Sequence, residues 1–270
     1  MRLSRAALAL AFIGLPAAAA LAHNPITSRG QAQWAGLLGA VLLLAAWVLY
    51  MRGLRRQPAR VVHALTFHAA ALVCALALFG PLDDWARTST SAHMVQHMLL
   101  MVVIAPLWVL ARPLPQMHAA LGPAGPSVFR PLLRLAARPL TAAYLHGAVI
   151  WFWHTPYFYM LAVDNPWWHA LEHACFLLTA CAFWWAVLNA SHRNAAWSLL
   201  AVLFTLMHTG FLGAVLTFAS APLYGEARDL ADQQLAGLVM WVVGGIPYLL
   251  ASGWIAHRWY GQLRRRMEEA

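Results

Sequence analysis

Seven long apolar runs, separated by short polar segments, constrain this chain more than any other feature of its sequence. A helix needs about 20 apolar residues to cross the hydrocarbon core of a bilayer, and each run has roughly that length. The runs occupy residues 32–51, 60–80, 91–111, 136–154, 168–189, 196–219 and 234–257. We therefore expect an all-α fold, a polytopic membrane helical bundle with seven transmembrane helices.

The composition excludes several other classes of protein. With 62% hydrophobic and 10% charged residues, the chain is too apolar for an ordinary soluble domain. A net charge of +9 can indicate a nucleic-acid partner, but the arginines lie between the apolar runs, where they orient membrane proteins, so we expect no nucleic acid. The three cysteines lie inside apolar runs without a CxxC spacing, so we expect neither a disulfide framework nor a thiolate zinc site.

The N-terminus has the pattern of a secretory signal. A start with two arginines precedes an Ala/Leu-rich stretch, which ends in the A-x-A cleavage pattern at residues 20–22. We predict a signal peptide over residues 1–22, and an uncleaved first helix is the alternative. The membrane domain then covers residues 23–258, and a basic tail covers residues 259–270.

The arginines predict how the spans are oriented. The segments expected on the inner side, with the adjoining span ends, carry thirteen arginines: Arg52, Arg55, Arg56, Arg60, Arg112, Arg130, Arg134, Arg138, Arg193, Arg258, Arg264, Arg265 and Arg266. The segments expected on the outer side carry three: Arg29, Arg87 and Arg228. Because arginine is retained on the cytoplasmic side, we expect the C-terminus in the cytoplasm.

The third apolar run, in SAHMVQHMLLMVVIAPLWVLARP, concentrates side chains that bind metals. On a helix its two histidines and three methionines, His93, Met94, His97, Met98 and Met101, fall within an arc of about 140°. Imidazole and thioether suit copper better than they suit magnesium or calcium. An imidazole facing lipid would lack a polar partner, so we expect this arc to face other helices and a metal.

A second pair of histidines with the same spacing opens the fifth run, in PWWHALEHACF. His169 and His173 share a helix face, with Glu172 beside them. In the predicted orientation both pairs lie near the outer face, as do His154 at the end of the fourth run and Asp232 before the seventh. Five histidines and two carboxylates from four spans are therefore expected to converge.

Two HxxxH pairs on neighbouring helices supply four imidazoles, which is a sufficient set for copper or zinc. Paired across helices, they would also suit axial ligation of a haem. The alternative is that the histidines only pack and hydrogen-bond inside the bundle. For Glu172 the options are a ligand, a proton acceptor or a partner that orients an imidazole, and we favour the last.

Three further histidines, His68, His146 and His208, lie near the middle of their runs. With Met207 and Met240 they would mark a path inward from the outer face. For His68 and His146 we favour hydrogen bonds to a neighbouring helix instead. Single methionines in apolar helices are usually core residues.

Motifs of catalysis are missing from the sequence, which has no P-loop, no GxSxG and no nucleophile beside a base. Hydrolytic catalysis therefore finds no support, and we do not expect an enzyme.

The chain resembles the bacterial polytopic cytochrome c oxidase assembly factor family called CtaG in four segments: HMVQHMLLMVVIAPLWVLARP, WFWHTPYFYM, HALEHACFLLTACAFWW and PLYGEARDLADQQLAGLVMWVVGG. These occur in the order seen in the family, and the resemblance covers roughly residues 30 to 258. The matching positions are His93, His97, His154, His169, Glu172, His173, Tyr224, Asp232, Gln233, Gly237, Met240 and Trp241.

The resemblance implies a multi-span protein of the bacterial inner (plasma) membrane that is needed to make active haem-copper oxidase, by delivering copper to the buried copper centre of the oxidase. The outer face would then be periplasmic. The partners would be an oxidase subunit in the same membrane and a periplasmic copper donor.

Our leading hypothesis from the sequence is a non-enzymatic assembly factor that holds copper, as Cu(I), near the periplasmic face. The expected metal-site residues are His93, His97, His169 and His173, with Met94, Met98 and Met101 as soft additions and His154, Glu172 and Asp232 as helpers. The alternatives are a copper transporter, a haem-binding membrane redox protein and a structural scaffold for oxidase subunits.

Overall fold

The computed structural model describes residues 30–191, 194–225 and 228–269. The predicted signal segment, 1–22, lies outside them. The described part is all-α, without a strand, as the sequence predicted. Its α-helices are α2 (Gln31–Arg56), α3 (Val61–Phe79), α4 (Pro81–Thr88), α5 (Thr90–Met98), α6 (Ala105–Ala111), α7 (Leu114–Leu121), α8 (Gly125–Leu135), α9 (Pro139–Trp153), α10 (Pro156–Asp164), α11 (Pro166–Leu188), α12 (Ala195–Thr217), α13 (Leu230–Leu238) and α14 (Gly245–Glu269). Two π-helices, η1 (Leu99–Ile104) and η4 (Val239–Val243), and one 3-10 helix, η2 (Gly122–Ala124), complete the list.

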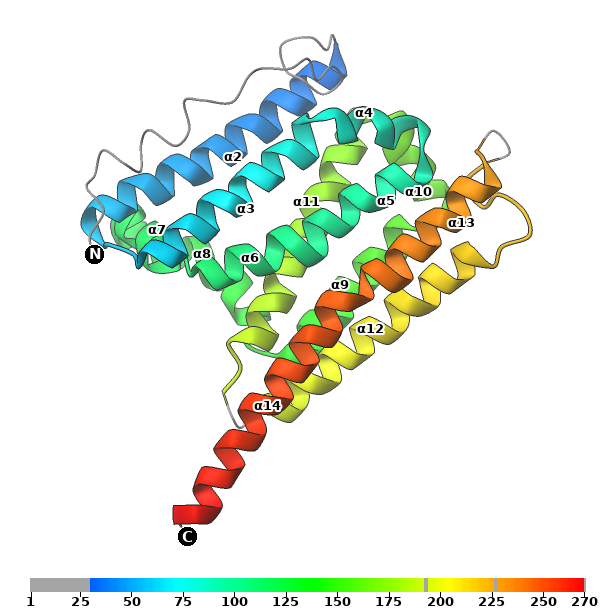
Figure 1. Cartoon of the computed structure of the whole chain (residues 1–270). Coiled ribbons are helices and arrows are strands. Elements are labelled where there is room, and N and C mark those ends of the chain that lie inside the picture. The colour runs from blue at the N-terminus through cyan, green and yellow to red at the C-terminus, as the bar shows by residue number, and fades with distance from the viewer. Residues whose placement is uncertain (1–29, 192–193, 226–227, 270) are drawn as a thin grey trace.

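The centre of the bundle is the helix formed by α5, η1 and α6. It packs against α3 on one side, α11 on a second and α13, η4 and α14 on a third, while α9 and α12 lie farther out (Figure 1). Of the candidate membrane spans it is the most buried, with 61% of its apolar window inside the protein. A helix surrounded in this way needs few lipid-facing residues, which is why it can carry the polar side chains of its first two turns.

Six helices of the described part are long and apolar enough to cross a bilayer: Gln31–Arg56, Val61–Phe79, Thr90–Ala111, Pro166–Leu188, Ala195–Thr217 and Leu230–Glu268. They correspond to six of the seven predicted spans, and several apolar helices of this kind fit a membrane protein. The remaining predicted span, 136–154, contains α9, which has 15 residues and is about 22 Å long at 1.5 Å per residue. The count of seven is therefore not confirmed.

Short helices occupy segments between the spans. The segment between the third and fourth runs, 112–135, folds into α7, η2 and α8. Two further short helices, α4 and α10, were not predicted. The helix α9 ends at Trp153, next to the predicted end of the fourth run, because Pro156 starts α10 and disfavours helical geometry in the residue before it. The predicted basic tail is helical up to Glu269, where α14 ends, and this part of α14 projects beyond the other helices (Figure 1).

Both π-helices lie just before a proline. η1 precedes Pro106 and η4 precedes Pro247, and in η4 the N–H of Gly244 donates to the Val239 carbonyl, five residues back, at 2.9 Å. Proline has no N–H to donate and its ring crowds the preceding turn, so the helix widens there instead of continuing regularly. The sequence predicts a kink at each of these prolines, and the π-helices are the form that the irregularity takes.

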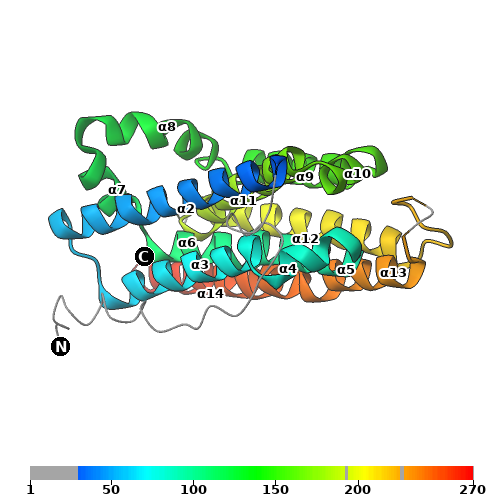
Figure 2. The ribbon, with the colours of Figure 1, turned by 90° about the horizontal axis from the view of Figure 1, so that it is seen from above.

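Successive long helices run in opposite directions, so their starts and ends are divided between the two ends of the bundle. These two ends carry different side chains. The α10 end contains α4, α10 and the starts of α5, α11 and α13 (Figure 2). The opposite end contains α7, α8 and the end of α2, whose last turn carries Arg55 and Arg56. All the predicted metal-site residues at helix starts lie toward the α10 end.

Candidate metal centre

The helix α5 carries the first pair of histidines in its first two turns. The Ser89 side chain caps the helix by accepting the N–H of Ala92. His93 and His97, four residues apart, lie on one face, and both are buried. The Nδ1 atom of His93 lies 3.3 Å from the carbonyl oxygen of Ala86 in α4, so Nδ1 carries the proton and Nε2 is left as an acceptor.

The helix α11 carries the second pair. The Asn165 side chain caps it by accepting two backbone N–H groups of the first turn, and Pro166 occupies the first helical position. His169, Glu172 and His173 follow on the buried face, and Glu172 is fully buried. Both histidine pairs therefore stand on helix starts whose position is fixed by a side-chain cap.

The two pairs face each other across the space between α5 and α11. Along each helix the imidazole centroids are 4.2 Å apart for His93 and His97 and 4.1 Å for His169 and His173. Across the space they are 5.1 Å apart for His93 and His169 and 5.6 Å for His97 and His173. The four imidazoles form a quadrilateral, so the convergence expected from the sequence is present.

Glu172 lies within this quadrilateral. Its Oε2 atom is 3.4 Å from Nε2 of His93 and 3.5 Å from Nε2 of His97. Neither carboxylate oxygen takes part in a hydrogen bond within the described part of the chain, and neither does Nε2 of His93 or of His97. Buried polar atoms in proteins nearly always have partners, so a group of such atoms requires an explanation.

The ligand atoms form two groups that share Glu172. One contains His93, His169 and Glu172, and the other contains His97, His173 and Glu172; within each group the atoms lie within 4.8 Å of one another. The sequence favoured Glu172 as a partner that orients an imidazole. Its central position makes it a candidate ligand instead, which spacing alone could not reveal.

His154 approaches the cluster from the end of α9. Its Nδ1 lies 2.8 Å from the carbonyl oxygen of Ile150, and its ring centroid is 5.8 Å from that of His97. Nε2 of His154 is buried without a hydrogen bond. A histidine that donates one ring N–H to a backbone carbonyl presents its other nitrogen as a ligand, which is the arrangement found at metal sites.

Two tyrosines cover the cluster, and sequence reasoning gave neither a role in its geometry. Tyr159 of α10 lies 5.1 Å from His93 between ring centroids and stacks on Tyr224 at 3.8 Å. The Tyr224 hydroxyl donates to the backbone carbonyl of His154 at 3.3 Å. Burial raises the pKa of Tyr224, so the phenol stays protonated and keeps this donor. A lone tyrosine in an irregular segment carries no sequence signal, although Tyr224 is among the family positions.

Asp232 lies apart from the imidazoles and contacts the start of α5. Its carboxylate accepts hydrogen bonds from the backbone N–H groups of Thr90 and Ser91 and from the hydroxyls of Ser89 and Ser91. A carboxylate is favourable at a helix N-terminus, where backbone N–H groups lack partners. Asp232 therefore joins α13 to the start of α5, the helix that carries His93 and His97.

The three methionines predicted as soft additions are buried in the apolar core. The sulfur of Met98 lies against Gly244, where η4 meets α14. The backbone carbonyl of Met101 accepts the Trp184 indole N–H at 2.7 Å. The residues of the predicted arc therefore face two neighbours. Its histidines face α11, whereas the side chain of Met98 contacts the junction of η4 and α14.

The histidines in the middle of the bundle have different surroundings. Trp47 donates its indole N–H to Nδ1 of His68 at 3.2 Å, and Nδ1 of His146 lies 2.8 Å from the Thr179 hydroxyl. The prediction that these two histidines hydrogen-bond to a neighbouring helix is confirmed. Met207, expected on an inward path, is 74% exposed on the outside of the bundle.

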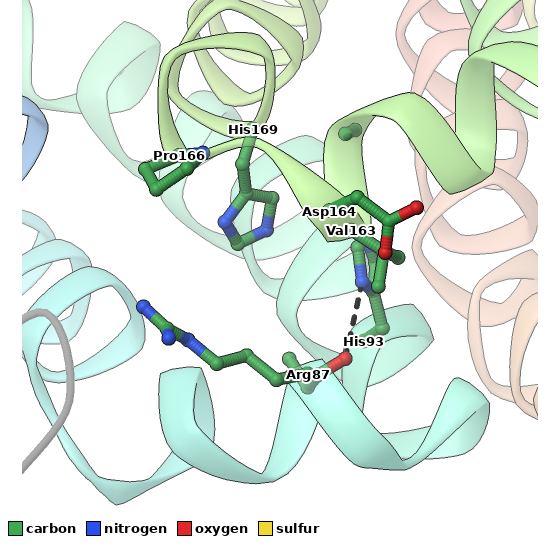
Figure 3. A pocket seen from close by; sticks show the side chains of 8 residues that line it. Arg87, His93, Val163, Asp164, Pro166 and His169 are labelled. Atoms are coloured by element: carbon green, nitrogen blue, oxygen red, sulfur yellow. Dashed lines mark hydrogen bonds between the residues drawn. The ribbon is translucent and has the colours of Figure 1, made fainter. Parts of the chain in front are cut away.

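A small cavity of about 60 Å³ opens beside the cluster (Figure 3). His93 and His169 face it from α5 and α11, with Arg87 of α4 and Asp164 at the end of α10 at its rim. His97 and His173 do not line it. Its volume is enough for a few water molecules, so this side of the cluster is the accessible one.

The donor set fits a transition-metal ion. Five imidazoles and one carboxylate converge from three parts of the chain, and several of their buried ligand atoms lack hydrogen bonds. Imidazole with carboxylate suits copper, zinc and iron, whereas calcium and magnesium prefer oxygen alone. The fold and this cluster together define a class: helical membrane proteins with a buried histidine–carboxylate centre.

Comparison with known families places the chain more closely. The family model described as cytochrome c oxidase caa3 assembly factor (Caa3_CtaG) matches residues 41–262, and the chain belongs to this family. The resemblance to CtaG is thereby confirmed. No curated protein and no solved structure matches the chain.

Proposed function

We propose that this protein binds copper at the histidine–Glu172 cluster and delivers it to haem-copper cytochrome c oxidase during assembly of the oxidase. The family supplies the assembly role. The observation that carries the copper step is the convergence of buried imidazoles on a buried carboxylate without hydrogen bonds. In this proposal the protein carries the copper ion and catalyses no reaction on it.

A bound cation would compensate for the burial of Glu172. An ionised carboxylate taken out of water costs several kcal/mol unless charge or hydrogen bonds offset the loss. In a purely structural scaffold the same position would be more stable with an apolar side chain. The position of Glu172 between four imidazoles therefore favours a site that binds a positively charged ion.

The size of the site favours an ion over a haem. Pockets that enclose a cofactor as large as a haem have volumes of several hundred Å³. The cavity beside the cluster has a volume of about 60 Å³. The imidazole centroids are also 4.1 to 5.6 Å apart along the edges of the quadrilateral, which leaves no gap for a macrocycle. Imidazole suits copper and carboxylate adds an oxygen donor that suits Cu(II), so the site does not require the thioethers.

Delivery also needs access from the correct side of the membrane. Most of the described arginines lie at helix ends opposite the cluster, so by charge bias the cluster would face the periplasm and the C-terminus would lie in the cytoplasm. In this orientation a periplasmic donor would load the site, and an oxidase subunit in the same inner membrane would receive the ion.

Metal analysis of the purified full-length protein tests the proposal. We expect copper to co-purify with the wild type under reducing conditions and to fall at least about tenfold in His97→Ala and His173→Ala. His146→Ala, equally buried but outside the cluster, should retain wild-type copper. In cells that rely on these variants, oxidase copper and activity should fall in parallel. A wild-type protein without copper would contradict the proposal and favour a scaffold.

A further inference from the structure

The cluster contains two sets of ligands rather than one. Each set takes one histidine from α5, one from α11 and the shared Glu172. The set with His93 and His169 borders the cavity, and the set with His97 and His173 lies one helical turn farther into the bundle. Four residues of helix correspond to a rise of about 6 Å, so the sets are displaced along the helices.

A single ion does not fit all four imidazoles as they stand. An imidazole bound through nitrogen at about 2 Å has its centroid about 3 Å from the ion, so two imidazoles on one tetrahedral ion lie about 5 Å apart. His93 and His169, at 5.1 Å, satisfy this distance, and His97 and His173, at 5.6 Å, nearly do. His93 and His173, on the diagonal, are 6.5 Å apart and exceed it.

Glu172 is placed to serve both sets. A carboxylate has two oxygens with about four lone-pair sites, so it can bind two ions at once. Both oxygens of Glu172 are buried without a hydrogen bond in the described residues, and Oε2 is nearly equidistant from His93 and His97, at 3.4 and 3.5 Å. Sites with two metals place the ions about 3.5–4 Å apart, a separation that a bridging carboxylate spans.

We propose that the cluster binds two copper ions bridged by Glu172, an outer ion on His93 and His169 and an inner ion on His97 and His173. This deepens the proposed function and rests on it. His154, whose Nε2 is available and whose ring is 5.8 Å from His97, completes the inner position with a third imidazole. The outer position has two imidazoles and borders the water-sized cavity, so the outer ion is the one that exchanges.

The number of ions per chain tests this. The purified full-length protein is titrated with Cu(I) against a chromophoric chelator, and we expect two copper ions per wild-type chain. The double variant H93A/H169A should bind one ion tightly, and H97A/H173A should bind one that the chelator removes faster. The control H146A/H208A, which changes two histidines outside the cluster, should still bind two.

A second measurement has its main readout in the wild type, where no variant has to fold. When the wild type is loaded with Cu(II), two ions bridged by one carboxylate should couple, so the electron paramagnetic resonance signal should integrate to clearly less than the copper present. H93A/H169A should give an uncoupled signal that accounts for all of its single copper. One copper per wild-type chain with a full signal would overturn the two-ion site and leave the proposed function intact. Wild-type protein without any copper would overturn both.

Discussion

One histidine of the cluster and one histidine in the middle of the bundle have the same burial but different surroundings. His97 in the cluster and His146 in the middle of the bundle are both completely buried. His146 has a hydroxyl partner on Thr179, whereas His97 has a carboxylate and three other imidazoles around it and no hydrogen bond within the described residues. Burial alone therefore does not distinguish a candidate site from a histidine that joins two helices.

The distinguishing feature is convergence on a charge. In the mid-bundle group each described polar contact is a neutral pair, such as the Trp47 indole with His68, which stabilises by about 1 kcal/mol. In the cluster the carboxylate of Glu172 has imidazoles but no hydrogen bonds, so its charge depends on a proton or a metal ion for compensation. Variants that remove the charge, the support of α5 or a mid-bundle hydrogen bond should separate these roles.

Removing the charge should have the largest effect. In Glu172→Gln the shape is kept and both candidate ion positions lose their anionic ligand, so copper affinity should fall by more than about 100-fold. The metal-free variant should unfold at the same temperature as the metal-free wild type or at a higher one, because the substitution removes a buried charge that has no hydrogen bonds. Chelator competition and calorimetry measure the two quantities.

The matched control is Gln96→Glu, which adds a carboxylate one residue before His97. Gln96 is buried and donates to the Ala77 carbonyl and to Asp83, so this change places two carboxylates together and should lower stability without supplying a ligand. Wild-type copper affinity in Glu172→Gln would show that the carboxylate is not a ligand and that the two groups of histidines do not differ as argued.

Loosening the support of α5 should have an intermediate effect. Asp232→Ala removes the carboxylate that holds the first turn of α5, so the histidine pair should be less well positioned and copper affinity should fall about tenfold. Loss of the cap should also lower the free energy of unfolding by about 1 kcal/mol. Hydrogen exchange of the first turn of α5 should accelerate in this variant.

Asp229→Ala is the control for that change. Asp229 caps its own helix, α13, by accepting the N–H of Ala231. It should lower stability by a similar amount and leave copper affinity within about twofold. Equal losses of affinity in both variants would mean that Asp232 acts on global stability rather than through α5.

The fold could be predicted largely because run length determines it. The third run, predicted over 91–111, is helical over Thr90–Ala111, and the other long helices agree within a few residues except for α14. The fourth run was predicted to end at His154, close to the observed end of α9 at Trp153, whereas the short helix α10 that follows was not predicted. Hydropathy is similar on both sides of Pro156, so only the proline marks the break.

The cluster could be predicted only in outline. Two HxxxH pairs have to present paired imidazoles, and the alternation of helix directions brings them to one end. How one arc divides between two neighbours depends on packing, so the sequence grouped Met98 with His97 although its sulfur lies against Gly244. The central position of the Glu172 carboxylate depends likewise on the conformation of its side chain and on how α5 packs against α11. The spacing of residues along the chain determines neither.

The smallest effect should come from removing a hydrogen bond of the mid-bundle histidines. It tests whether these histidines serve only to join helices. The Thr179 hydroxyl donates to the Cys175 carbonyl at 2.7 Å, so it can only accept from the Nδ1–H of His146. Thr179→Val keeps the shape and leaves that N–H unpaired, which should lower the free energy of unfolding by about 1–2 kcal/mol with copper affinity unchanged. Thr66→Val, which removes only a bond from a threonine to its own helix, should cost less. If Thr179→Val weakened copper binding tenfold, His146 would be coupled to the cluster, and the separation into a metal group and a packing group would be wrong.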